Sequence, residues 1–141
     1  MMNTSGEIIY IDDDDQDRLL FFDTYQAIRK DLALENKLIL FSNGYDAFNY
    51  LKNSEKPYLI ISDINMPLFS GCELKESIDN ELSHLKDVPF IYMSSVADYY
   101  TLYNDCPELR VDNFIDKMDY NKLYERLAAI IKQHNITTIP V

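Results

Sequence analysis

The sequence has few basic residues. Of its 141 residues, 13 are lysine or arginine and 24 are aspartate or glutamate, which gives a net charge of −11. A surface of this charge repels phosphate backbones, so we expect no direct binding to nucleic acid. It favours divalent cations and basic partner surfaces instead.

Long apolar runs and a targeting segment are also missing. No apolar stretch approaches the ~20 residues that cross a bilayer. Residues 1–6 contain no basic segment followed by an apolar run, the pattern of a secretory signal. We therefore expect no membrane span and a cytoplasmic protein. A chain of 141 residues, 47% of them hydrophobic, suits one domain over residues 1–141, with its core at about 7–133 and a tail at 135–141.

Cysteine and glycine are both scarce. Cys72 and Cys106 are the two cysteines, and their spacing is not that of a metal site. Because disulfides are rare in the cytosol, we interpret both as small reduced residues and expect no disulfide. No glycine-rich loop follows the first apolar segment, and the four acids found there would repel a phosphate, so a flavin or nucleotide site is disfavoured.

What the sequence does contain is a series of short apolar segments that end at polar residues. The first, Ile8-Ile9-Tyr10-Ile11, runs directly into four aspartates. Such segments are typical of buried strands, and we predict strands at 8–11, 38–41, 58–61, 89–93 and within 111–115. Helical spacing predicts helices at about 15–32, 45–51, 72–85, from about 97 to before residue 107, and at the C-terminal end. This alternation predicts an α/β, flavodoxin-like, doubly wound five-stranded parallel sheet of order 2-1-3-4-5, with helices on both faces.

The polar residues at the predicted strand ends would meet at one edge of that sheet. Asp12 and Asp13 would lie beside Asp63 at the topological switch point, with Ser94 and Lys117 arriving from neighbouring strands. Oxygen ligands select a hard cation, and Mg²⁺ held by two or three carboxylates fits best. A carboxylate beside such a metal can attack a phosphoryl group and become an aspartyl-phosphate, while the cations and a hydroxyl stabilise the phosphoryl oxygens.

The motifs that carry this pattern are IIYIDDDDQDR, LIISDINMPLFSG, PFIYMSS and FIDK. In this order and spacing they resemble a response-regulator receiver domain of two-component signalling, over about residues 7–133. The resemblance implies that Asp63 is the phosphoacceptor and that Asp12 and Asp13 hold Mg²⁺, with Asp13 the more direct ligand. Asn65 lies where the family offers a backbone carbonyl to the metal.

The resemblance also implies a switch and a set of partners. Ser94 matches the switch hydroxyl, Lys117 the family's lysine and Phe114 the aromatic switch position. Capture of the phosphate by Ser94 would let Phe114 turn inward and remodel the face made by the fourth helix, fifth strand and fifth helix. The expected partners are a sensor histidine kinase or a histidine phosphotransfer protein, a downstream protein target and, through the same face, a second copy. Such a domain is a phosphorylated signalling protein rather than an enzyme.

Two features depart from the family pattern. Met118 stands where the family usually has a proline that follows the lysine through a cis bond. A cis bond before a residue other than proline costs ~2.5–4 kcal/mol, so we predict that the Lys117–Met118 bond is trans, or cis with strain. Asp116 could compete for the Lys117 ammonium, but strand alternation should point the two side chains to opposite faces. Residues 105–110 contain a proline and extra length, so we expect a reshaped signalling face there.

Three rival functions use the same residues. A haloacid-dehalogenase-type phosphatase would use Asp12 as nucleophile and Asp14 as acid and base, but we find no late acidic metal motif and no cap domain. A calcium loop would use Asp12, Asp14 and Gln16, but Asp17 stands where a sharp turn needs glycine. A degenerate receiver, which binds partners without phosphorylation, remains open because of Met118.

Overall fold

Strands and helices alternate along the part of the chain that the computed structural model describes, residues 6–95 and 99–136. The strands are β1 (Ile8–Ile11), β2 (Leu38–Phe41), β3 (Leu59–Asp63), β4 (Phe90–Ser94) and β5 (Phe114–Asp116). The helices are α1 (Asp15–Leu32), α2 (Gly44–Lys52), α3 (Gly71–Glu81), α4 (Tyr99–Asp105) and α5 (Leu123–Ile136). Three 3₁₀ turns complete the order: η1 (Ser83–Leu85), η2 (Val111–Asn113) and η3 (Tyr120–Lys122). The predicted helix start at 97 and 98 lies outside the described residues, and so do residues 137–141 of the predicted tail. The first two residues of that tail, 135 and 136, instead belong to α5.

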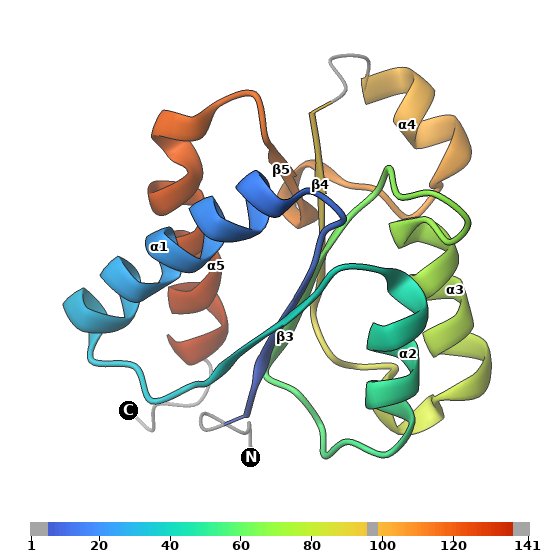
Figure 1. Cartoon of the computed structure of the whole chain (residues 1–141), viewed down its shortest axis with the longest axis horizontal. Coiled ribbons are helices and arrows are strands. Elements are labelled where there is room, and N and C mark those ends of the chain that lie inside the picture. The colour runs from blue at the N-terminus through green and yellow to red at the C-terminus, as the bar shows by residue number, and fades with distance from the viewer. Residues whose placement is uncertain (1–5, 96–98, 137–141) are drawn as a thin grey trace.

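The five strands form one parallel sheet in the order β2-β1-β3-β4-β5. Ile8 pairs with Leu38 of β2 on one side and with Leu59 of β3 on the other. The predicted α/β fold, the parallel sheet and its strand order are therefore confirmed. The strands all point towards the top of Figure 1, so their carboxyl ends meet at one edge.

Two apolar cores lie on opposite faces of the sheet, because successive strand residues point to opposite sides. Ile8 and Tyr10 of β1 belong to the core under α1 and α5, whereas Ile9 and Ile11 belong to the core under α2, α3 and α4. Figure 1 shows α1 and α5 on one side of the sheet and α2 and α3 on the other. None of the helices in the described ranges is both long and apolar enough to cross a membrane.

Side-chain caps fix where three of the helices begin. The Asp14 carboxylate accepts a hydrogen bond from the Asp17 N–H at 2.9 Å and so caps α1, and acids in the first turn suit the helix dipole. Asn43 caps α2 in the same way. Ser70 and Glu73 form a reciprocal capping box at the start of α3.

The third helix is shorter than its apolar pattern predicts. We expected a helix to residue 85, but α3 ends at Glu81 and the chain continues as η1. Leu82 leaves the helical region, at φ −121° and ψ 65°, yet both Leu82 and Leu85 stay buried. The apolar spacing therefore describes burial correctly, while no glycine or proline in the sequence marks the break.

The prediction of two free thiols is wrong. Cys72, in the first turn of α3, and Cys106, directly after α4, form a disulfide with their Cα atoms 5.6 Å apart. They lie 34 residues apart in the sequence, and the fold brings the start of α3 against the segment that follows α4. The expectation rested on how rarely cytosolic proteins use disulfides, which says nothing about whether two particular cysteines meet.

Candidate functional site

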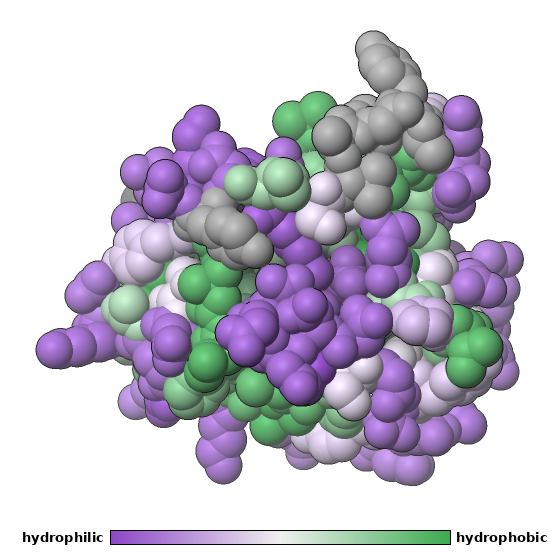
Figure 2. Space-filling view, turned by 45° about the horizontal axis from the view of Figure 1, so that its top comes forward, coloured by the Kyte–Doolittle hydropathy of each residue, from purple (hydrophilic) through white to green (hydrophobic). Residues whose placement is uncertain are grey.

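Polar side chains from four strands gather at the carboxyl edge of the sheet. Asp12 directly follows β1, Asp63 ends β3, Ser94 ends β4 and Lys117 directly follows β5. Parallel strands bring these positions together whatever the details of packing, because all their carboxyl ends lie at one edge. Figure 2, in which the top of Figure 1 comes forward, shows hydrophilic side chains across the middle of this face.

Three carboxylates form a cluster at this edge. Asp12, Asp13 and Asp63 each offer an oxygen within 4.8 Å of the other two. Asp12 and Asp63 are buried, whereas Asp13 is exposed. Two charges at that separation repel by about 3.5 kcal/mol at an effective dielectric of 20. The cluster therefore needs positive charge, and its all-oxygen donor set fits Mg²⁺.

Lys117 supplies part of that charge from inside the protein. Its Nζ lies 2.6 Å from Asp12 Oδ2, 3.0 Å from Asp17 Oδ2 and 3.4 Å from Asp63 Oδ1. Burial lowers the pKa of Lys117, but the hydrogen bond to Asp12 and the charges of Asp63 and Asp12 raise it by more. The pKa therefore lies above its ordinary value, and the side chain stays a charged ammonium. The contact with Asp17 was not among the predicted ones. The helical spacing of α1 is a signal for it, because Asp17 shares a face of α1 with the buried Phe21.

Asp12 is held from several directions. The Tyr10 hydroxyl donates to Asp12 Oδ2 at 2.6 Å, and the Asp14 N–H donates to Oδ1 at 3.0 Å. Arg18 Nη1 donates to the Asp12 main-chain carbonyl at 2.7 Å. Burial, with the charge of Asp12, raises the pKa of Tyr10, so the phenol stays protonated and remains a donor. Tyr10 was not among the predicted site residues, although strand alternation puts residues 10 and 12 on the same face.

The negative charge of Asp63 is offset by weaker contacts than that of Asp12. Burial raises the pKa of its carboxyl group to about 7; Lys117 lowers it and Asp12 raises it. The Asn65 N–H donates to Asp63 Oδ1 at 3.4 Å. Gly71 packs directly against this residue, because a Cβ at Gly71 would lie 2.4 Å from the Asp63 main-chain oxygen. The start of α3 is therefore packed directly against the end of β3.

The remaining predicted residues are Asn65, Ser94 and Phe114. Asn65 Nδ2 donates to Ser94 Oγ at 2.9 Å, and Ser94 is fully buried whereas Ser95 is exposed. The hydrogen bond between Asn65 and Ser94 was not predicted from the sequence, and it joins the β3–α3 loop to the end of β4. Phe114 is half-buried and packs against the core shared with α2, α3 and α4.

Two expectations about the departures are confirmed. The Lys117–Met118 peptide bond is trans. Asp116 is exposed while Lys117 is buried, and the Asp116 carboxylate accepts a hydrogen bond from the Met118 N–H at 2.8 Å. Asp116 therefore organises the loop after β5 on the outside, and Asp17 is the additional acid that reaches the ammonium.

A groove of about 1120 Å³ leads away from the acid cluster along α3. It runs from Asp13 and Asn65 to Cys72, Cys106 and Pro107. Carboxylates from several elements line it: Asp13, Glu73, Glu76, Asp79, Asp105 and Glu108. The disulfide and Asp13 of the carboxylate cluster thus line the same groove.

Comparisons with known proteins agree with this architecture. The chain is 27% identical over 127 residues to a 3',5'-cyclic-nucleotide phosphodiesterase, regA, of Dictyostelium discoideum; the match covers 89% of this chain and 15% of that relative's length. The fold is similar to the chemotaxis response regulator CheY4 of Vibrio cholerae, with a TM-score of 0.71 at 18% identity, covering 93% of this chain and 99% of the other.

It is also similar to the receiver domain of the sensor histidine kinase PA1611 from Pseudomonas aeruginosa PAO1, a structure with a magnesium ion coordinated in its active-site cleft. That match has a TM-score of 0.69 at 15% identity and covers 91% of this chain and 98% of the other. At these identities the solved structures show the fold alone. The family model described as the response regulator receiver domain matches residues 8–128, most of the chain. The protein belongs to the response regulator receiver domain family.

Proposed function

We propose that this receiver domain accepts a phosphoryl group on Asp63 and signals through a changed protein-interaction face. One observation carries the proposal. The Asp63 carboxylate lies at the carboxyl edge of the sheet within 4.8 Å of two further carboxylates and 3.4 Å from the Lys117 ammonium. Receiver domains of two-component systems interact with histidine kinases or phosphotransfer proteins, and we propose such a protein as the donor here.

The same cluster is the proposed Mg²⁺ site. Asp12, Asp13 and Asp63 would hold the ion together with the main-chain carbonyl of Asn65. Asp13 is the more direct ligand because it is exposed, whereas both oxygens of Asp12 already accept hydrogen bonds. Bound Mg²⁺ would supply the positive charge that offsets the carboxylates and the phosphoryl oxygens.

The proposed reaction is a phosphoryl transfer. An Asp63 oxygen attacks the phosphorus of a phosphohistidine, an O–P bond forms, and the N–P bond breaks. The leaving imidazole nitrogen keeps the electron pair and takes a proton from solvent. Lys117 donates to a phosphoryl oxygen, because its ammonium already lies between Asp12 and Asp63. Positioning and charge neutralisation of this kind are the main demands of phosphoryl transfer.

We further propose how the modification is transmitted. Ser94, now paired with Asn65, would turn its hydroxyl to the phosphoryl group, and Phe114 would move inward from its half-buried position. The face made by α4, β5 and α5 would then change, which shifts the balance between two conformations. A downstream target, or a second copy of the chain, would bind that face.

Intact-protein mass spectrometry after incubation with acetyl phosphate and Mg²⁺ tests the phosphoacceptor. We expect a mass gain of one phosphoryl group in the native chain and none in Asp63→Asn. Asp23→Asn, which removes an exposed acid of α1, is the matched control and should label normally. Labelling that persists in Asp63→Asn would place the acceptor elsewhere. A folded native chain that never labels would make the domain a phosphorylation-independent binding module.

Thermal unfolding with and without Mg²⁺ tests the metal site. The ion should raise the melting temperature, because it binds the carboxylate cluster of the folded chain only. A chelator should reverse the effect, and Asp13→Asn should remove most of it. No shift at millimolar Mg²⁺ would contradict the site.

A further inference from the structure

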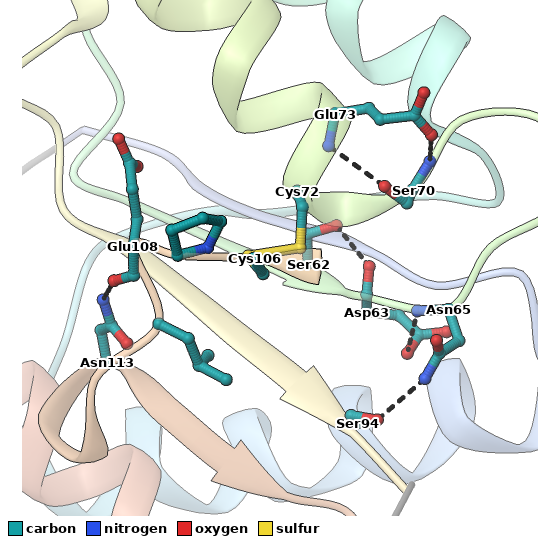
Figure 3. The surroundings of a disulfide bond; sticks show 12 residues. Ser62, Asp63, Asn65, Ser70, Cys72, Glu73, Ser94, Cys106, Glu108 and Asn113 are labelled. Carbon is teal, nitrogen blue, oxygen red and sulfur yellow. Dashed lines mark hydrogen bonds between the residues drawn. A yellow bond between two sulfur atoms is a disulfide. The ribbon is translucent and has the colours of Figure 1, made fainter. Parts of the chain in front are cut away.

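One half of the Cys72–Cys106 disulfide is anchored beside the proposed phosphoacceptor. Cys72 follows Gly71, whose N–H donates to the Ile64 main-chain oxygen at 3.0 Å and whose Cα is packed against the end of β3. Figure 3 shows the disulfide next to Ser62 and Asp63. Cys72 is therefore attached to a closely packed part of the site, the junction of β3 and α3.

The other half belongs to the segment that follows α4. The Cys106 N–H donates to the Leu102 carbonyl at 2.8 Å, and the Leu109 N–H donates to the Cys106 carbonyl at 3.0 Å. Leu102, Cys106 and Leu109 are all buried. A helix of seven residues is too short to be stable by itself, so its position depends on such attachments. The disulfide is the covalent one among them.

The disulfide is also accessible to a reductant. Both cysteines line the groove that opens beside Asp13 and Asn65, and Cys72 is partly exposed. The carboxylates along that groove repel anions, so they disfavour a small anionic thiol such as glutathione. A dithiol on a neutral or basic protein surface suits the groove better.

We propose that Cys72 and Cys106 form a reversible redox pair whose state decides whether phosphorylation of Asp63 can move α4. This inference rests on the proposed function. In the oxidised chain the disulfide links the segment directly after α4 to the first turn of α3. The start of α3 is in turn packed against Asp63. In the reduced chain only non-covalent packing holds that end, so α4 is able to shift when Ser94 rearranges.

The reducing step needs a dithiol protein as co-reactant. Its thiolate attacks the Cys72 sulfur, the bond between the two sulfurs breaks, and Cys106 leaves as a thiolate that takes up a proton. The second thiol of the reductant then attacks the mixed disulfide and releases Cys72 as a thiol. In total, two electrons and two protons pass to the pair, and the reductant becomes a disulfide.

The bond itself is tested by proteolysis without reductant followed by mass spectrometry. The expected product is a peptide pair joined through Cys72 and Cys106 that separates after treatment with dithiothreitol. Purified protein that stays unlinked after exposure to a mild disulfide oxidant would overturn the proposal.

Hydrogen exchange of residues 99–116, measured with and without acetyl phosphate, tests the coupling. In the reduced chain, phosphorylation should change exchange there by about 5-fold or more, the lower end of typical coupling between sites. In the oxidised chain the change should stay below about 2-fold. Equal responses in both redox states would overturn the proposal.

Two controls separate this inference from the function on which it rests. The Cys72→Ser/Cys106→Ser variant should respond like the reduced chain under both conditions, and reductant on the native chain gives the same comparison if that variant folds poorly. Intact mass reports the phosphoryl label in each sample. If the oxidised and reduced chains carry the same label and show the same change in exchange, the redox coupling alone is refuted. If no sample carries a label, the proposed function is refuted and the coupling with it.

Discussion

Replacing Asp63 by asparagine should stabilise the metal-free protein. Asp63 is only 5% exposed, and its oxygen lies 3.4 Å from Lys117 Nζ and within 4.8 Å of Asp12 and Asp13. At an effective dielectric of 20 the attraction is about 5 kcal/mol and each repulsion about 3.5 kcal/mol. The two repulsions together exceed the attraction by about 2 kcal/mol. Burial, the largest cause, acts in the same direction, which agrees with a pKa raised to about 7.

The rise in pKa sets the size and the pH range of this effect. The Asp63 pKa rises from 3.8 to about 7 on folding. The folded chain therefore binds more protons than the unfolded chain between those values, and it loses stability as pH rises through them. The full loss corresponds to about 4 kcal/mol. The value of about 7 already includes the attraction to Lys117. Because the amide resembles the neutral carboxyl group, we expect Asp63→Asn to gain up to about 4 kcal/mol at about pH 8.

Urea unfolding in the presence of a chelator measures this gain. It should fall by more than half between about pH 8 and about pH 5, because the native carboxyl then takes up a proton. Asp23→Asn removes the same charge from an exposed position of α1 and should stay within about 0.5 kcal/mol of the native chain. The reasoning is refuted if Asp63→Asn is no more stable at the higher pH, or if its gain is the same at both.

Three further substitutions or treatments test the packing around the site. Gly71→Ala places a Cβ against the Asp63 main-chain oxygen and should lower the free energy of unfolding in urea by about 1–3 kcal/mol. An unchanged midpoint would contradict the close packing of α3 against β3. Asp17→Ala leaves the buried Lys117 short of an acceptor and should cost about 1–3 kcal/mol, whereas Asp17→Asn keeps an acceptor and should cost clearly less. Equal losses would count against a hydrogen-bonding role. Reducing the disulfide should cost about 3–4 kcal/mol, as expected for a closed loop of this length, and a midpoint that does not move with dithiothreitol would contradict that.

The sequence by itself determined the sheet and the membership of its carboxyl edge. Apolar segments that alternate with helical spacing permit few arrangements other than a doubly wound parallel sheet. In such a sheet, residues that follow the strands meet at one edge whatever the detailed packing. Asp12, Asp63, Ser94 and Lys117 could therefore be placed together from their positions alone, although their roles in phosphoryl transfer remain proposals.

The tertiary structure decided which side chains complete that edge and how the neighbouring helices are held. The contact between Asp17 and Lys117 joins residues 100 apart and depends on how α1 is rotated against the sheet. The pairing of Cys72 with Cys106 depends on where α4 lies over the start of α3. Local patterns describe which face of an element is buried, but not which partner a side chain meets across the fold. That partner is set by the relative placement of whole elements, and here it turned two apparently unremarkable cysteines into a covalent link beside the site.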